Sequence, residues 1–148
     1  MKWKGRSSNK GKFKPYNTSK YKGDPTGIVY RSSWELKLMI FLDKNPAILE
    51  WNSEEIIIPY ISPIDNKRHR YFPDFWVKRK NKEGIIEEII VEIKPKEQMM
   101  PPINPNKKNV AEYLRNQSKW TAAKNYCENK QWKFFVLNEE NLGIRRSN

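Results

Sequence analysis

Two runs of apolar and β-branched residues stand out in the middle of the chain, at residues 71–77 and 85–93. A polar segment that ends in Gly84 separates them, and this arrangement is typical of a β-hairpin. We expect a three-residue loop at residues 82–84 with the glycine in the left-handed region, which brings Asn81 opposite the first residue of the second run.

Counting outward from this loop places Asp74 opposite Glu92, within one residue if the strand carries a bulge. Side chains alternate along a strand, so Glu92 and Lys94 point to one face and Ile93 points to the other. Carboxylate oxygens suit Mg²⁺, and a neighbouring lysine can orient a water for attack on phosphorus. The alternative interpretation is a solvated hairpin face with charges of both signs, but Pro73-Asp74 in register with Glu92 favours a site.

Residues 30–46 predict an amphipathic helix. Ser32 can cap its first turn, and Pro46 ends it. The apolar stripe at helical spacing consists of Trp34, Leu38, Phe41 and Leu42.

Glu35 lies at the edge of this stripe and has two interpretations. Ser32 and Glu35 match a capping box, in which the carboxylate reaches back to the Ser32 amide. If the helix packs near the hairpin, Glu35 is instead a third carboxylate for the metal site. The presence of the hairpin favours the second interpretation.

The rest of the chain supplies further elements: a first strand at 48–61 with an edge or bend at Pro59, a turn at 62–66, a loop at 95–108, a second helix at 107–129, a strand at 132–137 and a short helical end at 139–144. The order helix, three strands, helix, strand predicts an α/β fold with a mixed central sheet flanked by helices. The second helix carries its apolar residues near one face, which consists of Val110, Tyr113, Leu114, Trp120, Ala123 and Cys127. Gln117 lies on that side and is a candidate for the site helix.

The chain of 148 residues is long enough for one domain with its own core. Lys and Arg number 29 against 17 acidic residues, and the net charge of +12 points to a polyanion, with nucleic acid the first candidate. The basic excess is concentrated in residues 1–23, which we interpret as a flexible basic arm ahead of a folded domain at 24–148. The alternative is a solubilising tail. The expected DNA contacts are Lys2, Lys4, Arg6, Lys10, Lys12, Lys14, Lys20, Lys22 and, after the hairpin, Lys96.

Cys127 is the single cysteine, which excludes an internal disulfide and fits a reducing compartment. We find no apolar stretch typical of a signal peptide or a membrane span.

The residues resemble the PD-(D/E)xK nuclease superfamily, which has a restriction-endonuclease-like fold. The matching positions are Glu35 on a leading helix, Pro73-Asp74, and Glu92-Ile93-Lys94. Further matches, including Tyr30–Glu35 and Lys119–Ala123, make the chain similar to the head-completion nucleases of T-even-type bacteriophages. A more distant resemblance is to the endonuclease subunit of a heteromeric bacterial transposase.

This resemblance implies that Asp74, Glu92 and the Ile93 carbonyl bind Mg²⁺, for which Mn²⁺ can substitute, that Glu35 completes the acidic cluster, and that Lys94 orients the attacking water. It also implies a phage protein in the cytoplasm of the infected host or in the virion, which processes DNA at the packaged head. Portal or neck proteins and a second copy of the chain are its expected partners, and a membrane is not. Two alternatives stay open: a non-catalytic DNA- or portal-binding assembly protein, and a transposase-type or junction-resolving nuclease.

Overall fold

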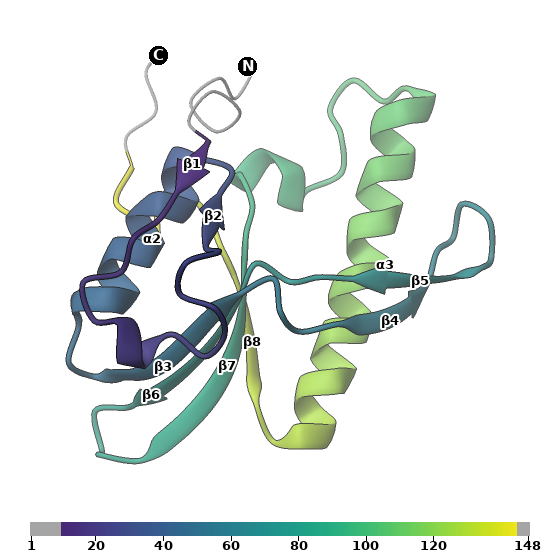
Figure 1. Ribbon diagram of the computed structural model, residues 1–148. Helices are drawn as coiled ribbons and strands as arrows, with labels where there is room; N and C mark the ends of the chain where they lie inside the picture. The colour runs from purple at the N-terminus through teal and green to yellow at the C-terminus, as the bar shows by residue number, and fades with distance from the viewer. Residues whose placement is uncertain (1–9, 145–148) are drawn as a thin grey trace.

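The computed structural model describes residues 10–144 (Figure 1). Its helices are α2 (Ser33–Lys44) and α3 (Lys107–Lys130), with short 3-10 helices η1 (Thr18–Lys20) and η2 (Lys96–Met99). Its strands are β1 (Gly11–Lys12), β2 (Val29–Tyr30), β3 (Ile48–Ser53), β4 (Ile58–Ile61), β5 (Arg68–Tyr71), β6 (Phe75–Lys80), β7 (Ile86–Ile93) and β8 (Lys133–Leu137).

The central sheet has the strand order β3-β6-β7-β8. The first two pairings are antiparallel, and β8 joins β7 in parallel after the α3 crossover, so the sheet is mixed, as the sequence predicts. The predicted hairpin is confirmed in its register. Phe75 pairs with Val91, the Asn81 N–H donates to the Ile85 carbonyl at 2.9 Å, and Gly84 has a φ of 79°.

Helices cover both faces of this sheet, with α2 on one side and α3 on the other (Figure 1). The core on the α2 side includes Trp34, Leu38, Met39, Leu42, Trp51, Phe75, Val77, Val91 and Ile93. The core on the α3 side forms two clusters, which include Tyr60, Tyr71, Trp76, Ile90, Trp120, Ala123 and Cys127. Two predicted stripe positions are wrong: Phe41 is 52% exposed and Leu114 is 44% exposed, whereas Met39 and Asn116 are the buried residues nearby.

The predicted first strand is two strands in two sheets. β3 lies in the central sheet, whereas β4 pairs with β5 in a separate antiparallel hairpin beside α3 (Figure 1). The expected strand at 71–77 is divided as well, because Tyr71 ends β5 and β6 begins at Phe75. The end at 139–144 forms turns rather than a helix.

Residues 10–23 belong to the folded domain, so the predicted boundary of the basic arm at residue 23 is wrong. Phe13 and Tyr21 are buried and pack edge-on against Trp51, with ring centroids 5.9 and 4.8 Å away. The buried Asp43 carboxylate accepts backbone hydrogen bonds from residues 16 and 17 at 2.7 and 2.9 Å. The sequence did not reveal this packing because every contact joins positions far apart in the chain. Lys2, Lys4 and Arg6 lie outside the described residues.

Candidate active site

Asp74 and Glu92 meet at the end of the central sheet where β6 begins and β7 ends. The Ile93 N–H donates to Asp74 Oδ2 at 2.8 Å, and the Asp74 N–H donates to Glu92 Oε1 at 3.2 Å. Each carboxylate is therefore held by the backbone of the other strand. Glu92 is 7% exposed and Asp74 is half-buried, so the pair lies at the base of the site rather than on a solvated face.

Glu35 lies in the first turn of α2, and it is 5% exposed. The Glu35 N–H donates to Ser32 Oγ at 3.1 Å, which confirms Ser32 as the helix cap. Glu35 Oε1 accepts a hydrogen bond from the Arg31 N–H at 3.2 Å, one residue before the predicted Ser32 amide. The carboxylate thus stabilises the entry to the helix.

The Arg31 guanidinium connects these acids. It pairs with Glu54, and this pairing raises the pKa of Arg31, with smaller contributions from the carboxylates of Glu35 and Asp74. Glu54 adopts a positive φ of 55°, and its N–H donates to the Asp74 carbonyl at 3.1 Å. Arg31 is therefore a cation at the edge of the acidic site, and sequence reasoning assigned it no role.

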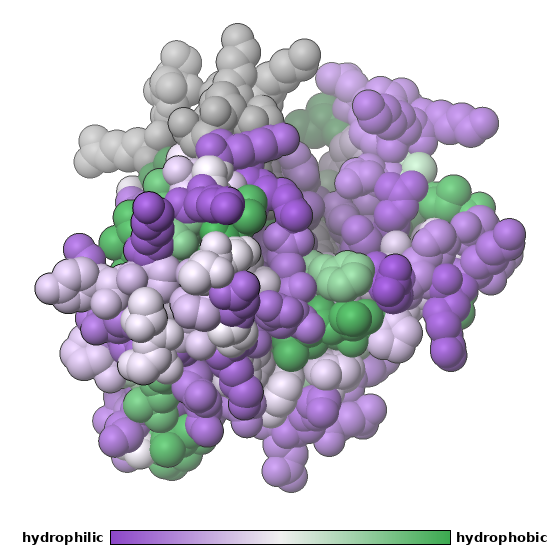
Figure 2. All heavy atoms as spheres, in the orientation of Figure 1, coloured by the Kyte–Doolittle hydropathy of each residue, from purple (hydrophilic) through white to green (hydrophobic). Residues whose placement is uncertain are grey.

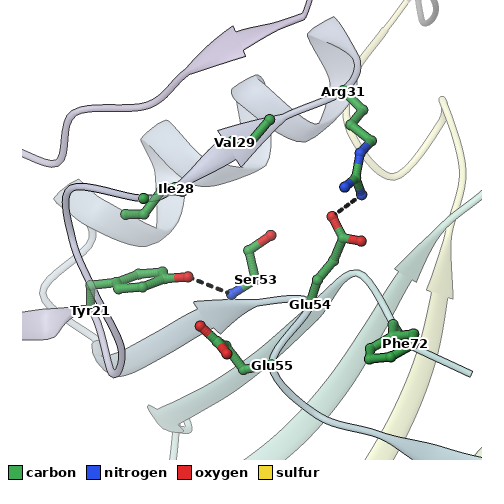
Figure 3. Close-up of a pocket in the computed structure, with 9 residues that line it drawn as sticks. Tyr21, Ile28, Val29, Arg31, Ser53, Glu54, Glu55 and Phe72 are labelled. Carbon is green, nitrogen blue, oxygen red and sulfur yellow. Dashed lines mark hydrogen bonds and ion pairs between the residues drawn. The ribbon is translucent and has the colours of Figure 1, made fainter. Parts of the chain in front are cut away.

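An open pocket of about 370 Å³ lies between β2, the end of β3 and the segment that leads into β6 (Figure 3). Arg31, Glu54, Glu55 and Phe72 are among its lining residues, and the Tyr21 hydroxyl accepts a hydrogen bond from the Ser53 N–H at its floor. The pocket is linked to the site through Glu54, which pairs with Arg31 and whose N–H bonds to the Asp74 carbonyl.

On the α3 side, Tyr71 and Lys119 lie next to Glu92. Burial, followed by the Glu92 carboxylate, raises the pKa of the Tyr71 hydroxyl. The Lys119 ammonium lies 5.7 Å from the Tyr71 ring centroid and 5.9 Å from that of Tyr60. Burial lowers the pKa of Lys119, an effect that Glu92 opposes and Lys94 reinforces. Lys119 is the second cation that sequence reasoning missed. No local sequence signal marks it, because its approach to Glu92 depends on how α3 packs over the sheet.

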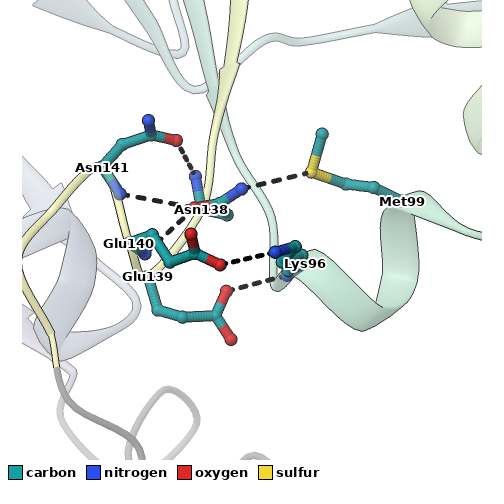
Figure 4. Close-up of polar contacts among 6 residues, drawn as sticks. All are labelled: Lys96, Met99, Asn138, Glu139, Glu140 and Asn141. Carbon is teal, nitrogen blue, oxygen red and sulfur yellow. Dashed lines mark hydrogen bonds and ion pairs between the residues drawn. The ribbon is translucent and has the colours of Figure 1, made fainter.

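The backbone after β7 is fixed by β8 and the turn beyond it. The Lys94 N–H donates to the Leu137 carbonyl at 2.9 Å, and the Lys96 N–H donates to the buried Glu139 carboxylate at 2.8 Å (Figure 4). Lys94 is half-buried, whereas the Lys96 ammonium pairs with Glu140 at 2.6 Å. Lys94 therefore leaves the sheet on a rigid segment, and Lys96 is already engaged by a carboxylate.

The other predicted site residues lie elsewhere. Gln117 lines a different pocket, between β4 and α3, with none of the carboxylates. The Lys20 ammonium donates to the carbonyls of Asp43 and Asn45 at the end of α2, at 3.0 and 2.7 Å, and so serves the fold. Four expected DNA contacts are exposed: Lys10, Lys12, Lys14 and Lys22.

The carboxylate pair fits a hard divalent cation in its donor chemistry. Among residues 10–144, no three His, Cys, Asp or Glu side chains are grouped to hold a metal ion. The described residues thus offer the Asp74–Glu92 pair rather than a full protein cage. Mg²⁺ binds through one or two carboxylates and retains water and phosphate ligands, so this sparse set suits it.

Comparison with known proteins agrees with this geometry. A model of the N-terminal region of TnsA-like endonucleases matches residues 45–139, which is more than half of the chain. The chain belongs to the TnsA-like endonuclease family. The matched region runs from just before β3 to just after β8, and it contains Asp74, Glu92, Lys94 and Lys119 but not Glu35.

A relative extends the similarity beyond the matched region. The head completion nuclease of Enterobacteria phage T4 is 40% identical over 142 residues, which cover 89% of this chain and 92% of the relative. Within residues 10–144, no helix is long and apolar enough to cross a membrane.

Proposed function

We propose that the chain is a Mg²⁺-dependent DNA endonuclease that hydrolyses phosphodiester bonds during phage head completion. The observation that carries this proposal is the interlocked Asp74–Glu92 pair at the sheet end, with Lys94 two residues further along the same strand direction. Membership of an endonuclease family and the similarity to the phage T4 protein support it.

The site residues have different roles in the proposed reaction. Asp74 and Glu92 would hold the metal with the Ile93 carbonyl, and the bound metal would supply Lewis-acid stabilisation of the phosphate charge. Lys94 orients the attacking water and offsets the negative charge that develops on phosphorus. Glu35 contributes negative charge at the edge of the site through its placement beside Arg31.

Cleavage of supercoiled plasmid with Mg²⁺ or Mn²⁺ tests the proposal, with EDTA as the metal-free control. We expect nicking or linearisation by the wild-type chain, and loss of at least about a hundredfold in rate for Asp74→Ala and for Lys94→Ala with unchanged thermal unfolding. Lys82→Ala, in the loop at the other end of the hairpin, is the matched control and should cut normally. A folded wild-type protein that binds plasmid but never cuts it with either metal would support a non-catalytic DNA-binding assembly protein instead.

A further inference from the structure

The β4–β5 hairpin presents a face that nothing covers within the described residues. Ile58, Tyr60 and Tyr71 are buried in the core cluster shared with α3, so this side of the hairpin is occupied. The alternate positions, Pro59, Ile61, Arg68 and Arg70, are exposed. The register pairs Pro59 with Arg70 and Ile61 with Arg68, which places both guanidinium groups on the outer face.

This outer face is basic. Between residues 58 and 72 the only acid is Asp65, and its carboxylate bonds to His69 Nε2 at 2.8 Å and to the Lys67 N–H. Within residues 10–144, neither Arg68 nor Arg70 forms an ion pair with a carboxylate. Arg70 lies over the ring of Phe72 at 5.7 Å, and Phe72 is 39% exposed.

The face leads directly to the candidate active site. Phe72 lines the pocket that also contains Arg31 and Glu54, and the Glu54 N–H bonds to the Asp74 carbonyl. At about 3.3 Å per extended residue, Arg70 lies within roughly 13 Å and Arg68 within roughly 20 Å of Asp74. One strand of duplex DNA rises about 3.4 Å per base pair, so the two arginines lie within roughly four and six base pairs of Asp74.

We propose that the outer face of β4–β5 is a DNA-backbone track, in which Arg68 and Arg70 bind phosphates on one side of the bond that is cut. This inference rests on the proposed nuclease function and names the surface that the substrate occupies. The charge of the face, together with a visible molecular surface that is mostly hydrophilic with only small hydrophobic groups (Figure 2), favours a polyanion over an apolar protein partner.

Phe72 has a specific place on this track. Its ring lies under the Arg70 guanidinium and lines the pocket that contains Arg31 and Glu54, where it can stack on a base or sugar near the scissile phosphate. Arg68 and Arg70 then contact the backbone further away. Neither contact reads sequence, so we expect the track to contribute affinity and orientation for any DNA sequence.

The chain provides a matched control for this track. Lys78 and Lys80 follow Asp74 by four and six residues, as Arg70 and Arg68 precede it, but they run along β6 toward the opposite end of the sheet. The test measures DNA affinity as a function of salt concentration in the Asp74→Ala variant, which should bind DNA without cutting it. One variant adds Arg68→Gln and Arg70→Gln, and the control adds Lys78→Gln and Lys80→Gln.

We expect the arginine variant to flatten the slope of log affinity against log salt by about 2 and to bind at least about tenfold more weakly at low salt. The lysine control should keep the slope of the parent. Equal losses in both variants, or no loss in the arginine variant, would overturn the track. If the parent does not bind DNA at all, the track fails, and plasmid cleavage by the wild-type chain then shows separately whether the nuclease function stands.

Discussion

The carboxylates of the candidate site are held in place by hydrogen bonds from the backbone of the neighbouring strand. Asp74 and Glu92 each bond to the backbone of the opposite strand, at 2.8 and 3.2 Å. Their placement could be predicted from the sequence because a hairpin loop and strand alternation are local rules. The placement of Lys119 could not be predicted, since its approach to Glu92 depends on how α3 packs over the sheet.

Lys119 gives a prediction at this scale. Burial lowers its pKa in the folded protein, so the protonated form destabilises the fold at neutral pH relative to the unfolded chain. Lys119→Met removes that cost and retains the volume, so we expect an unchanged or higher thermal midpoint. Plasmid cleavage should nevertheless fall by about tenfold or more, because a positive charge beside Glu92 is lost.

Lys124→Met is the control for this experiment, because Lys124 lies exposed on the same helix. It should alter neither the midpoint nor cleavage. Full activity in Lys119→Met would show that the lysine only packs against Tyr60 and Tyr71.

At the scale of elements, the sequence predicted those whose signals are continuous and missed those that depend on distant partners. The β6–β7 hairpin and α2 carry turn, cap and periodicity signals within a single stretch. β4 and β5 do not carry such signals. Arg68–Tyr71 has no apolar alternation, and the apolar residues on both sides of Pro73 suggest one continuous strand where the structure has a break. The error matters for function, since the missed hairpin carries the basic face beside the site.

The end of α2 provides the prediction at this scale. Three carbonyls there, those of Leu42, Asp43 and Asn45, accept from the Lys20 ammonium. Such a cation offsets the negative end of the helix dipole. Lys20→Gln should lower the free energy of unfolding by about 1 kcal/mol, measured by chemical denaturation. The salt slope of DNA binding should not change, because this ammonium is not available to phosphate. Lys22→Gln is the neighbouring control, because the Lys22 ammonium lies over the Trp76 ring. A reduced salt slope in Lys20→Gln would restore the predicted role of Lys20 as a DNA contact.

The molecule has a hydrophobic core on each face of the central sheet. The candidate active site lies at the end of this sheet where β6 begins and β7 ends. Asp74, Glu92 and Lys94 share one face of the hairpin, toward α3, while Glu35 arrives from α2 on the other. A site built in this way requires both layers to be in place. The segment at residues 10–23 is part of the α2 layer, although its composition resembles that of a basic arm.

Two deletions separate these roles of the N-terminal region. Removal of residues 1–22 takes away Phe13 and Tyr21, whose rings pack against the fully buried Trp51, and it removes the partners of the Asp43 carboxylate. The loss of one buried aromatic side chain costs about 3–5 kcal/mol, so we expect this chain to unfold at a much lower denaturant concentration or not to fold.

Removal of residues 1–9 keeps all of these contacts while eliminating Lys2, Lys4 and Arg6. It should therefore leave the denaturation midpoint close to that of the full chain, and any change in its salt-dependent DNA binding reports on those three charges alone. Equal stability of the two deletions would mean that residues 10–22 contribute nothing to the α2 layer, contrary to their burial.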